Sequence, residues 1–269
     1  MEILNQIRHH FSPSQPSVSV SNKSVSYREH IPRTELQPFI YCYWQLKTTC
    51  ALDNPYQYRV VSDGCIDIFF NAVKPDESFV MGLSNDYTMF DLGHEFNYIG
   101  IRFLPSIFSQ LFDVDASILT NTYMPLADLN KDMAYHISSS THSGVTLHQL
   151  AELFDHHFFN QISNLSIDLD MRFYEALLAI VKSHGCAEIK NIKTGLSERQ
   201  LRNIFKYLIG ESPKKFSKIV RFQHLLKSKP SLESLRNNKI LYESGYFDQS
   251  HFIRDFKKLY GLSPSRAIE

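Results

Sequence analysis

Short runs of β-branched and aromatic residues, separated by turn residues, fill the chain between residues 27 and 104. The clearest runs are YRVVSDGCIDIFFNA, FVMGL, YTMFDLG and FNYIGIRFL. Such residues favour strands, and the Asp63-Gly64 pair inside the first run is a turn signal. Several short strands at this spacing predict a β-sandwich or a small β-barrel.

From Val145 onward the apolar residues recur at threes and fours, which is the period of an amphipathic helix. One helix is predicted over residues 145–162, with apolar positions at Leu147, Leu150, Phe154, His157 or Phe158, and Ile162. A second is predicted over residues 168–183, on an apolar face of Phe173, Leu177, Ile180 and Val181. The chain beyond this point is predicted to be helical.

Two later segments repeat one plan, in which a glycine turn is followed by a capped amphipathic helix. In the first, Gly195 and the N-cap Ser197 precede an apolar face of Leu201, Ile204, Phe205 and Leu208. In the second, a short helix over residues 240–244, Gly245 and the cap Asp248 precede Phe252, Phe256 and Leu259. A helix predicted over residues 213–227 can hold the two units about 34 Å apart, one turn of DNA.

The opposite face of each capped helix carries side chains that suit DNA. The first face has Arg199, Arg202, Asn203 and Lys206, and the second has Gln249, Ser250, His251, Arg254 and Lys257. Arginine matches the O6/N7 edge of guanine, asparagine matches the N6/N7 edge of adenine, and lysine suits phosphate. Either helix alone is equally typical of a solvated surface helix, but two copies of the same plan favour DNA binding.

Charge is distributed unevenly along the chain. The 269 residues carry no net charge, yet residues 1–165 hold 9 Lys and Arg against 17 Asp and Glu, and residues 166–269 hold 19 against 11. Net charges of −8 and +8 predict two modules with different partners, with nucleic acid as the first candidate for the basic one. No apolar run is long enough to cross a membrane and no export signal is evident, so we expect a cytoplasmic protein.

Residues 167–269 resemble the two-unit DNA-binding domain of the AraC/XylS transcription regulators. The matching segments are GLSERQLRNIFK, GESPKKF and GYFDQSHFIRDFKKLYGLSPS. The family usually places small residues in the first helix of each unit, where this chain has Asn191 and Leu241. The resemblance implies a bacterial, nucleoid-associated regulator that binds promoter DNA, with RNA polymerase as a partner and an activator role favoured.

The resemblance also implies which residues contact DNA. The base-reading set is Arg199, Arg202, Asn203, Gln249, Ser250, His251 and Arg254. Apart from the resemblance, the basic residues expected to position the domain on phosphates are Lys206, Lys214, Lys215, Lys218, Arg221, Lys257 and Lys258. In the N-terminal half, residues 35–130 resemble the sensor-like domain of one subgroup of these regulators through YCYWQ, YRVVSDGCIDIFFN and IGIRFLPSIFSQLFDVDASILTNTYMPLADL. Such a domain is typically a small β-barrel that binds an effector, a partner or another subunit.

A small-molecule effector pocket in this half would be apolar with a few polar anchors. Its candidate walls are Trp44, Tyr58, Phe69, Phe79, Met81, Phe90, Arg102 and Phe103. The same aromatic residues are equally typical of an ordinary core. Arg59 and Arg102 lie within apolar strands, so each should face solvent, pair with an internal Asp or Glu, or meet an anionic ligand, because burying an unpaired charge is costly.

We expect neither enzymatic activity nor a metal or other cofactor. The strand region offers only His94-Glu95, whereas a metal-binding cupin needs several closely spaced ligands. His156-His157 are adjacent on a helix and are not expected to face one ligand. Four cysteines match no zinc pattern and indicate reduced thiols. The alternatives for the N-terminal half are a protein-interaction module without a ligand and, less favoured, a catalytic cupin.

The expected fold class is α+β, with a small cupin-like β-barrel and flanking helices followed by an all-α domain with two helix-turn-helix units. The expected domains are a flexible lead-in (1–26), a β-rich regulatory domain (27–144), a connector helix (145–165) and a DNA-binding domain (166–269). The apolar stripe of 145–162 either packs on its own barrel or pairs with a second subunit in a homodimer. The acidic half could also dock on the basic half as an autoinhibitory contact.

Overall fold

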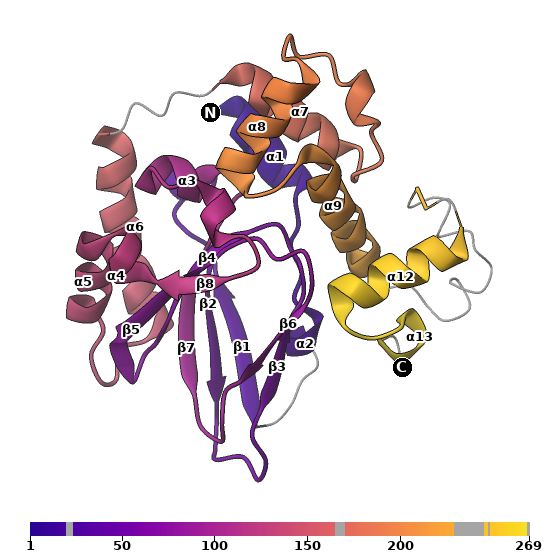
Figure 1. Ribbon diagram of the computed structural model, residues 1–269. Coiled ribbons are helices and arrows are strands. Elements are labelled where there is room, and N and C mark those ends of the chain that lie inside the picture. Colours follow the sequence, from indigo (N-terminus) through magenta and orange to yellow (C-terminus); the bar gives the residue numbers. More distant parts are fainter. Residues whose placement is uncertain (20–23, 165–169, 229–244, 247, 268–269) are drawn as a thin grey trace.

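The computed structural model describes residues 1–19, 24–164, 170–228, 245–246 and 248–267. The N-terminal half is rich in strands and the C-terminal half is helical, so the predicted α+β class is confirmed (Figure 1). The short helix expected over residues 240–244 lies outside the described residues. Within the described ranges, no helix is both long and apolar enough to span a membrane.

Six antiparallel strands form the main sheet, in the order β1-β2-β7-β4-β5-β8. The strands are β1 (Val25–His30), β2 (Ile40–Thr48), β7 (Asn97–Phe103), β4 (Ile66–Asn71), β5 (Lys74–Met81) and β8 (Tyr123–Pro125). A second sheet pairs β3 (Gln57–Val60) with β6 (Thr88–Asp91). The Asp63-Gly64 turn therefore closes no hairpin, because the strands on its two sides belong to different sheets.

One face of the main sheet packs against helices. The helix α6 (Leu147–Asn164) buries Leu150, Phe154 and Phe158 completely, and the ring of Phe154 lies 5.7 Å from that of Tyr43 on β2. Of the two roles left open for the connector helix, packing on its own sheet is the one observed. The helices α4 (Leu126–Leu129) and α5 (Lys131–Ser140) contact β5, whereas α3 (Ile107–Phe112) and η2 (Ala116–Leu119) contact α8 (Glu198–Ile209) of the helical half.

The other face of the main sheet meets the two-stranded sheet. A second apolar cluster lies here, formed by Cys42, Trp44, Leu46, Tyr58 and Phe96. Gly100 on β7 lies directly under the indole ring, since a Cβ at this position would be 2.2 Å from Cε2 of Trp44. Side chains therefore occupy the interior between the two sheets.

The N-terminal residues are helical, which corrects the flexible lead-in expected over residues 1–26. Helix α1 (Glu2–His10) buries Ile3, Leu4 and Ile7 and packs against α7 (Met171–Lys182) of the C-terminal half. Phe11 continues the contact, with its ring stacked 6.3 Å from that of Phe216. The apolar spacing of α1 is helical, but the helix is short, so its stability depends on the surfaces against which it packs. The short elements α2 (Pro16–Ser19) and η1 (Thr34–Leu36) follow.

The C-terminal half contains α7, η3 (Ile189–Asn191), α8 (Glu198–Ile209), α9 (Pro213–Lys227), α12 (Gln249–Tyr260) and α13 (Pro264–Ala267). The first helix of the first helix-turn-helix unit is only the single turn η3, which has no buried residue. Its polar sequence EIKNIK leaves too few apolar side chains to anchor a longer helix. Helix α9 runs from the region of α8 to that of α12 (Figure 1).

Candidate nucleic-acid interface

Helix α8 has the two faces that its sequence predicts. Leu201, Phe205 and Ile209 are buried, and the ring of Phe205 lies 5.0 Å from that of Phe173 on α7. The helix begins with a capping box in which Ser197 and Gln200 exchange side-chain to backbone hydrogen bonds. The four polar residues expected to face DNA are all exposed, namely Arg199, Arg202, Asn203 and Lys206.

Helix α12 is built in the same way. Phe252, Phe256 and Leu259 are buried, and the ring of Phe256 lies 5.6 Å from that of Phe222 on α9. Asp248 caps the helix by accepting a hydrogen bond of 2.7 Å from the backbone N–H of His251. Of the expected base-reading residues on this helix, Gln249, Ser250 and Arg254 are exposed.

His251 is half-buried and differs from its neighbours. Its Nε2 lies 3.1 Å from Oδ2 of Asp255, and the ammonium of Lys218 on α9 lies 3.2 Å from the same oxygen. One carboxylate thus holds a side chain expected to read bases and one expected to contact phosphate. Neither group is as free as the exposed arginines of α8.

The lysines expected to contact phosphate fall into two groups. Lys206, Lys214 and Lys257 are exposed and make no ion pair within the described part of the chain. Lys215 pairs with Glu211 at 2.6 Å, and Lys258 lies 3.7 Å from Asp86. The Lys258–Asp86 pair is open to water, where ion pairs are weak, so it can exchange for a phosphate contact. In the other pair the Lys215 side chain is 55% exposed, but that of Glu211 is only 13% exposed.

Arg221 on α9 is placed differently from every other residue of the phosphate set. Its guanidinium donates hydrogen bonds of 2.8 Å to the backbone carbonyls of Gly185 and Gly245. It also lies over the ring of Tyr246, 5.5 Å from the ring centroid. Its donors are therefore directed into the protein.

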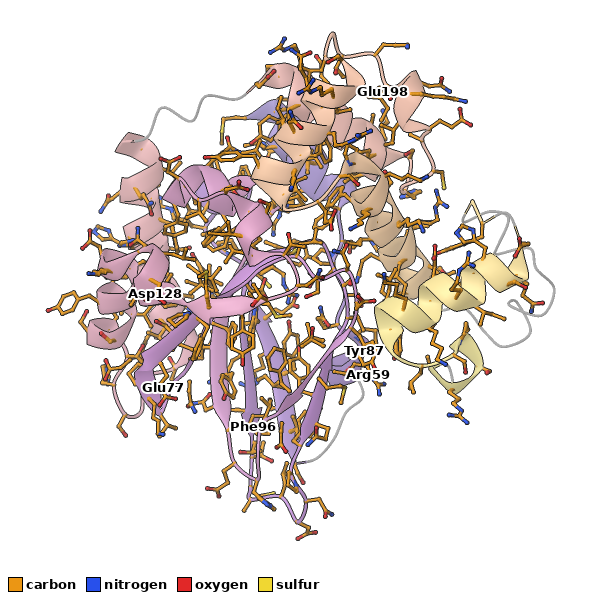
Figure 2. All side chains as sticks on the ribbon, in the orientation of Figure 1. Arg59, Glu77, Tyr87, Phe96, Asp128 and Glu198 are labelled. Carbon is orange, nitrogen blue, oxygen red and sulfur yellow. The ribbon has the colours of Figure 1, made fainter. Side chains whose placement is uncertain are left out.

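A loop of the β-rich half, residues 84–87, contacts both helix-turn-helix units, and sequence reasoning missed it. The side-chain amide of Asn85 donates to Glu211, which follows α8, at 2.6 Å. The backbone N–H of Tyr87 donates to the carbonyl of Lys258 on α12 at 3.2 Å. Figure 2 labels Tyr87 and its neighbour Arg59, whose guanidinium carbon lies 5.9 Å from the ring centroids of both Tyr87 and Tyr260.

The ends of α8 and α12 are where this docking occurs. Gly210 ends α8 at φ +97°, and its carbonyl accepts a hydrogen bond of 2.7 Å from Thr120. Gly261 ends α12 at φ +90° and lies against the ring of Tyr87. Glycine at a helix C-terminus is visible in a sequence, but nothing in the sequence indicates what lies against it.

A second set of hydrogen bonds joins Ser14 and Gln15, which follow α1, to the β-rich half and to α9. Gln223 on α9 is only 3% exposed; its Oε1 accepts from the backbone N–H of Ser14 at 2.7 Å, and its Nε2 donates to the carbonyl of Ser62 at 2.7 Å. The neighbouring Gln15 donates from Nε2 to Asp63 at 2.8 Å. A buried glutamine with satisfied hydrogen bonds is specific for its partners, because an unmatched polar group would be costly there.

Of the eight candidate pocket residues, most lie between the main sheet and the two-stranded sheet. The rings of Phe69 and Phe79 are 5.6 Å apart, and Phe90 lies 6.4 Å from Phe69. Trp44 and Tyr58 belong to the cluster between the sheets, and Met81 pairs in register with Asp67. Phe103 was assigned to the wrong face, because it packs 5.6 Å from Phe158 in the core under the helices. Neighbouring residues of a strand point to opposite faces.

Arg102 has an internal acidic partner, one of the three outcomes left open by the sequence. Its guanidinium lies 2.8 Å from Asp67 and 3.4 Å from Asp63, and its side chain is 5% exposed. Trp44 donates from Nε1 to Asp67 at 3.0 Å. Burial raises the pKa of the Asp67 carboxyl, and Arg102 opposes that shift. The carboxylates leave no unpaired charge on Arg102 for an anionic ligand.

A hollow of about 400 Å³ lies between α5 and α6, away from the two sheets. Its walls include Asn130, His136, His157 and Gln161. His136 and His157 are stacked there with ring centroids 4.2 Å apart. Within the described ranges, no three His, Cys, Asp or Glu side chains are grouped so that they could hold a metal ion.

Two capped helices with exposed arginine-rich faces, attached to one long helix, define a helix-turn-helix DNA-binding protein. A family model described as a helix-turn-helix domain matches residues 192–269, and one described as a domain of unknown function matches residues 28–125. The C-terminal part of the chain is an AraC-type helix-turn-helix domain, as its sequence predicts. The chain is thus a DNA-binding transcription regulator whose N-terminal half matches a domain family of unknown function.

Solved structures similar to this chain include ToxT from Vibrio cholerae O395, with 14% identity, a TM-score of 0.39, and coverage of 92% of this chain and 98% of ToxT. ToxT bound to (E)-4-(8-methylnaphthalen-1-yl)but-3-enoic acid has 14% identity and a TM-score of 0.38, and the match covers 91% of this chain and 98% of that ToxT chain. Unsaturated fatty acid bound wild-type ToxT from Vibrio cholerae strain SCE256 has 12% sequence identity and a TM-score of 0.37, and the match covers 91% of this chain and 93% of that ToxT chain. No curated protein matches.

Proposed function

We propose that this chain binds a specific double-stranded DNA sequence by placing α8 and α12 in successive major grooves. The observation that supports this proposal is the shared design of the two helices, each capped, anchored on α9 and exposed on a face with arginine. Arg199, Arg202, Asn203, Gln249, Ser250, His251 and Arg254 read bases, and Lys206, Lys214, Lys215, Lys218, Lys257 and Lys258 contact phosphate. His251 and Lys218 must first leave Asp255 to do so.

The test is selection from a random 40-base-pair duplex library with the full-length protein, followed by fluorescence anisotropy on the enriched duplex. We expect one enriched sequence and a steep fall in affinity between 50 and 200 mM salt, because each phosphate contact releases counterions. Binding that is steep in salt but enriches no sequence would leave only non-specific DNA contact. Absence of any salt-dependent binding would contradict the proposal altogether.

We also propose that the N-terminal half regulates this binding in the cytoplasm, next to RNA polymerase at a promoter. Support comes from the loop 84–87 and from Thr120, which contact the ends of both base-reading helices. A change in the β-rich half can reach α8 and α12 through these contacts. An activator role is the direction we propose, and reporter transcription with and without the gene for this chain measures it.

A ligand-free interaction module is the second candidate for the N-terminal half. The observation that favours it is the interior between the sheets, which Trp44, Tyr58 and Phe96 occupy while Arg102 is already paired. Native mass spectrometry of the full-length protein separates the candidates. A retained small mass indicates an effector, a bare dimer indicates regulation by self-association, and a bare monomer indicates a protein partner.

A further inference from the structure

Arg221 connects three parts of the helical half. It lies on α9, and its two terminal nitrogens donate 2.8 Å hydrogen bonds to Gly185, just after α7, and to Gly245, just before α12. An arginine fork can hold two carbonyls in fixed directions at once, which the single ammonium of lysine cannot do. One side chain therefore ties the turn after α7 to the turn before α12.

The two glycines have the geometry that such a tie requires. Gly185 has φ +76° and lies directly on the backbone of α9, because a Cβ there would be 2.1 Å from the carbonyl oxygen of Ser217. Gly245 has φ +70°, and a Cβ there would be 3.6 Å from Cζ of Arg221. The close approach of both turns to α9 brings their carbonyls within reach of one guanidinium.

Arg221 acts at the N-terminal end of α12, which is the end expected to read bases. Gly245 lies immediately before that end, where Gln249 and Ser250 are exposed. The opposite end of α12 is held separately, by the loop that carries Tyr87.

We propose that Arg221 is a positioning residue and not a phosphate contact. It fixes the N-terminal end of α12 relative to α7 and α8, and it thereby sets the spacing of DNA sites that the protein accepts. This inference rests on the proposed function, since spacing matters only if both helices enter DNA. A phosphate role would require Arg221 to give up two hydrogen bonds with backbone carbonyls and its contact with Tyr246.

The deciding experiment uses the duplex enriched by the wild-type protein, with one or two base pairs inserted between the two segments that the protein protects in a footprinting experiment. We expect the wild-type protein to bind each lengthened duplex about tenfold or more weakly than the original duplex, since the two helices can no longer both reach their base contacts. Arg221→Lys should bind the original and inserted duplexes within about threefold of each other. It should keep the wild-type salt slope, because the charge is retained.

The matched control is Lys214→Gln, an exposed residue in the first turn of the same helix. It should lower the salt slope by about one and keep the spacing preference, as a phosphate contact does. If Arg221→Lys keeps the wild-type spacing preference, the proposal is overturned, whatever happens to its salt slope. Should Arg221→Lys not unfold cooperatively, Gly245→Ala is measured instead, because alanine at φ +70° strains the turn that carries the same carbonyl.

A measurement without DNA separates this inference from the proposed function. Spin labels are attached at Lys206→Cys and Lys257→Cys, with the exposed Cys50 and Cys186 replaced by serine. Pulsed electron spin resonance then gives the distance distribution between α8 and α12 in the full-length protein. Arg221→Lys should broaden that distribution. An unchanged distribution overturns the positioning role even if DNA binding is proven, and a broadened one supports it even if no DNA is bound.

Discussion

The ring of Tyr87 lies against Gly261, the residue at which α12 ends. A Cβ at position 261 would be 2.7 Å from Cδ2 of that ring, and the backbone N–H of Tyr87 donates to Lys258 in the same turn. The β-rich half thus contacts the second helix-turn-helix unit through a surface that admits no side chain. Under the proposed function, this contact is the route by which the N-terminal half regulates α12.

Gly261→Ala is therefore expected to lower the free energy of unfolding more than Gly144→Ala does. Both glycines have positive φ, +90° and +84°, so each substitution carries a backbone penalty of about 1–2 kcal/mol. Only position 261 adds a steric clash, worth about another 1–3 kcal/mol, since nothing lies within 4 Å of a Cβ at position 144. Urea unfolding of both variants measures the difference, and equal losses would mean that the Tyr87 ring swings aside freely.

Phe205→Ala should destabilise the helical half by about 3–5 kcal/mol, because it leaves a cavity at a side chain that is 0% exposed. Ile253→Ala on α12 is the control, since Ile253 is 40% exposed and its loss should cost less than about 1 kcal/mol. Thermal unfolding followed by circular dichroism provides the comparison. A wild-type melting temperature for Phe205→Ala would show that the faces of α8 are wrongly assigned.

Helix α1 should contribute to stability as a packed element. Ile7 is 1% exposed against the helical half, so Ile7→Ala should cost about 2–4 kcal/mol. The adjacent exposed Gln6, replaced by alanine, should change stability by less than about 0.5 kcal/mol. Hydrogen exchange should also become faster in α7. If both variants unfold like the wild type, the N-terminal residues do not pack as described.

Arg202→Ala should weaken binding to the enriched duplex by about 1–3 kcal/mol and relax discrimination at one base position. The reason is the loss of a forked donor that matches one base pair in the major groove. Arg172→Ala, at an exposed arginine paired with Asp170 at 3.0 Å, serves as the control and should leave affinity unchanged. Anisotropy titrations on the enriched and on scrambled duplexes measure both. An equal loss on both duplexes would make Arg202 a phosphate contact.

Acid should destabilise the protein in part through His157. Burial first, and then the rings of His136 and His156, lower the pKa of His157 from 6.5 to about 4. Between these values the unfolded chain binds the proton and the folded chain does not, so stability falls as the pH is lowered from about 6.5 toward 4. Because the ring is only partly buried, the loss from pH 7 to pH 5 should be about 1 kcal/mol.

His157→Gln tests this assignment, with His142→Gln at an exposed position as the control. Urea unfolding at pH 7 and at pH 5 gives the pH-dependent part of the stability for each variant. His157→Gln should reduce that part by about 1 kcal/mol relative to wild type, and His142→Gln should leave it unchanged. The same pH dependence in all three proteins would place the acid-sensitive group elsewhere.

Much of the local structure could be predicted from the sequence, because it depends on neighbours along the chain. The helical period of the apolar residues sets the inward face of α8, on which Leu201 and Phe205 are buried and Leu208 is half-buried, and Ser197 caps the helix through residues within one turn. The α+β class follows in the same way, from a change of apolar period near Val145. Phe103 was placed on the wrong face because the spacing of aromatic residues does not reveal the alternation of its strand relative to the two layers.

Tertiary structure alone decided which surfaces meet. The sequence marks Gly210 and Gly261 as helix ends, but only the folded chain places Thr120 and Tyr87 against them. It likewise reveals α1 as a packed helix and directs Arg221 toward two backbone carbonyls instead of solvent. Helices and caps arise from contacts between near neighbours in the chain, whereas these tertiary contacts join residues tens to hundreds of positions apart. Their partners are chosen by the shape and unmet hydrogen bonds of surfaces that exist only after folding.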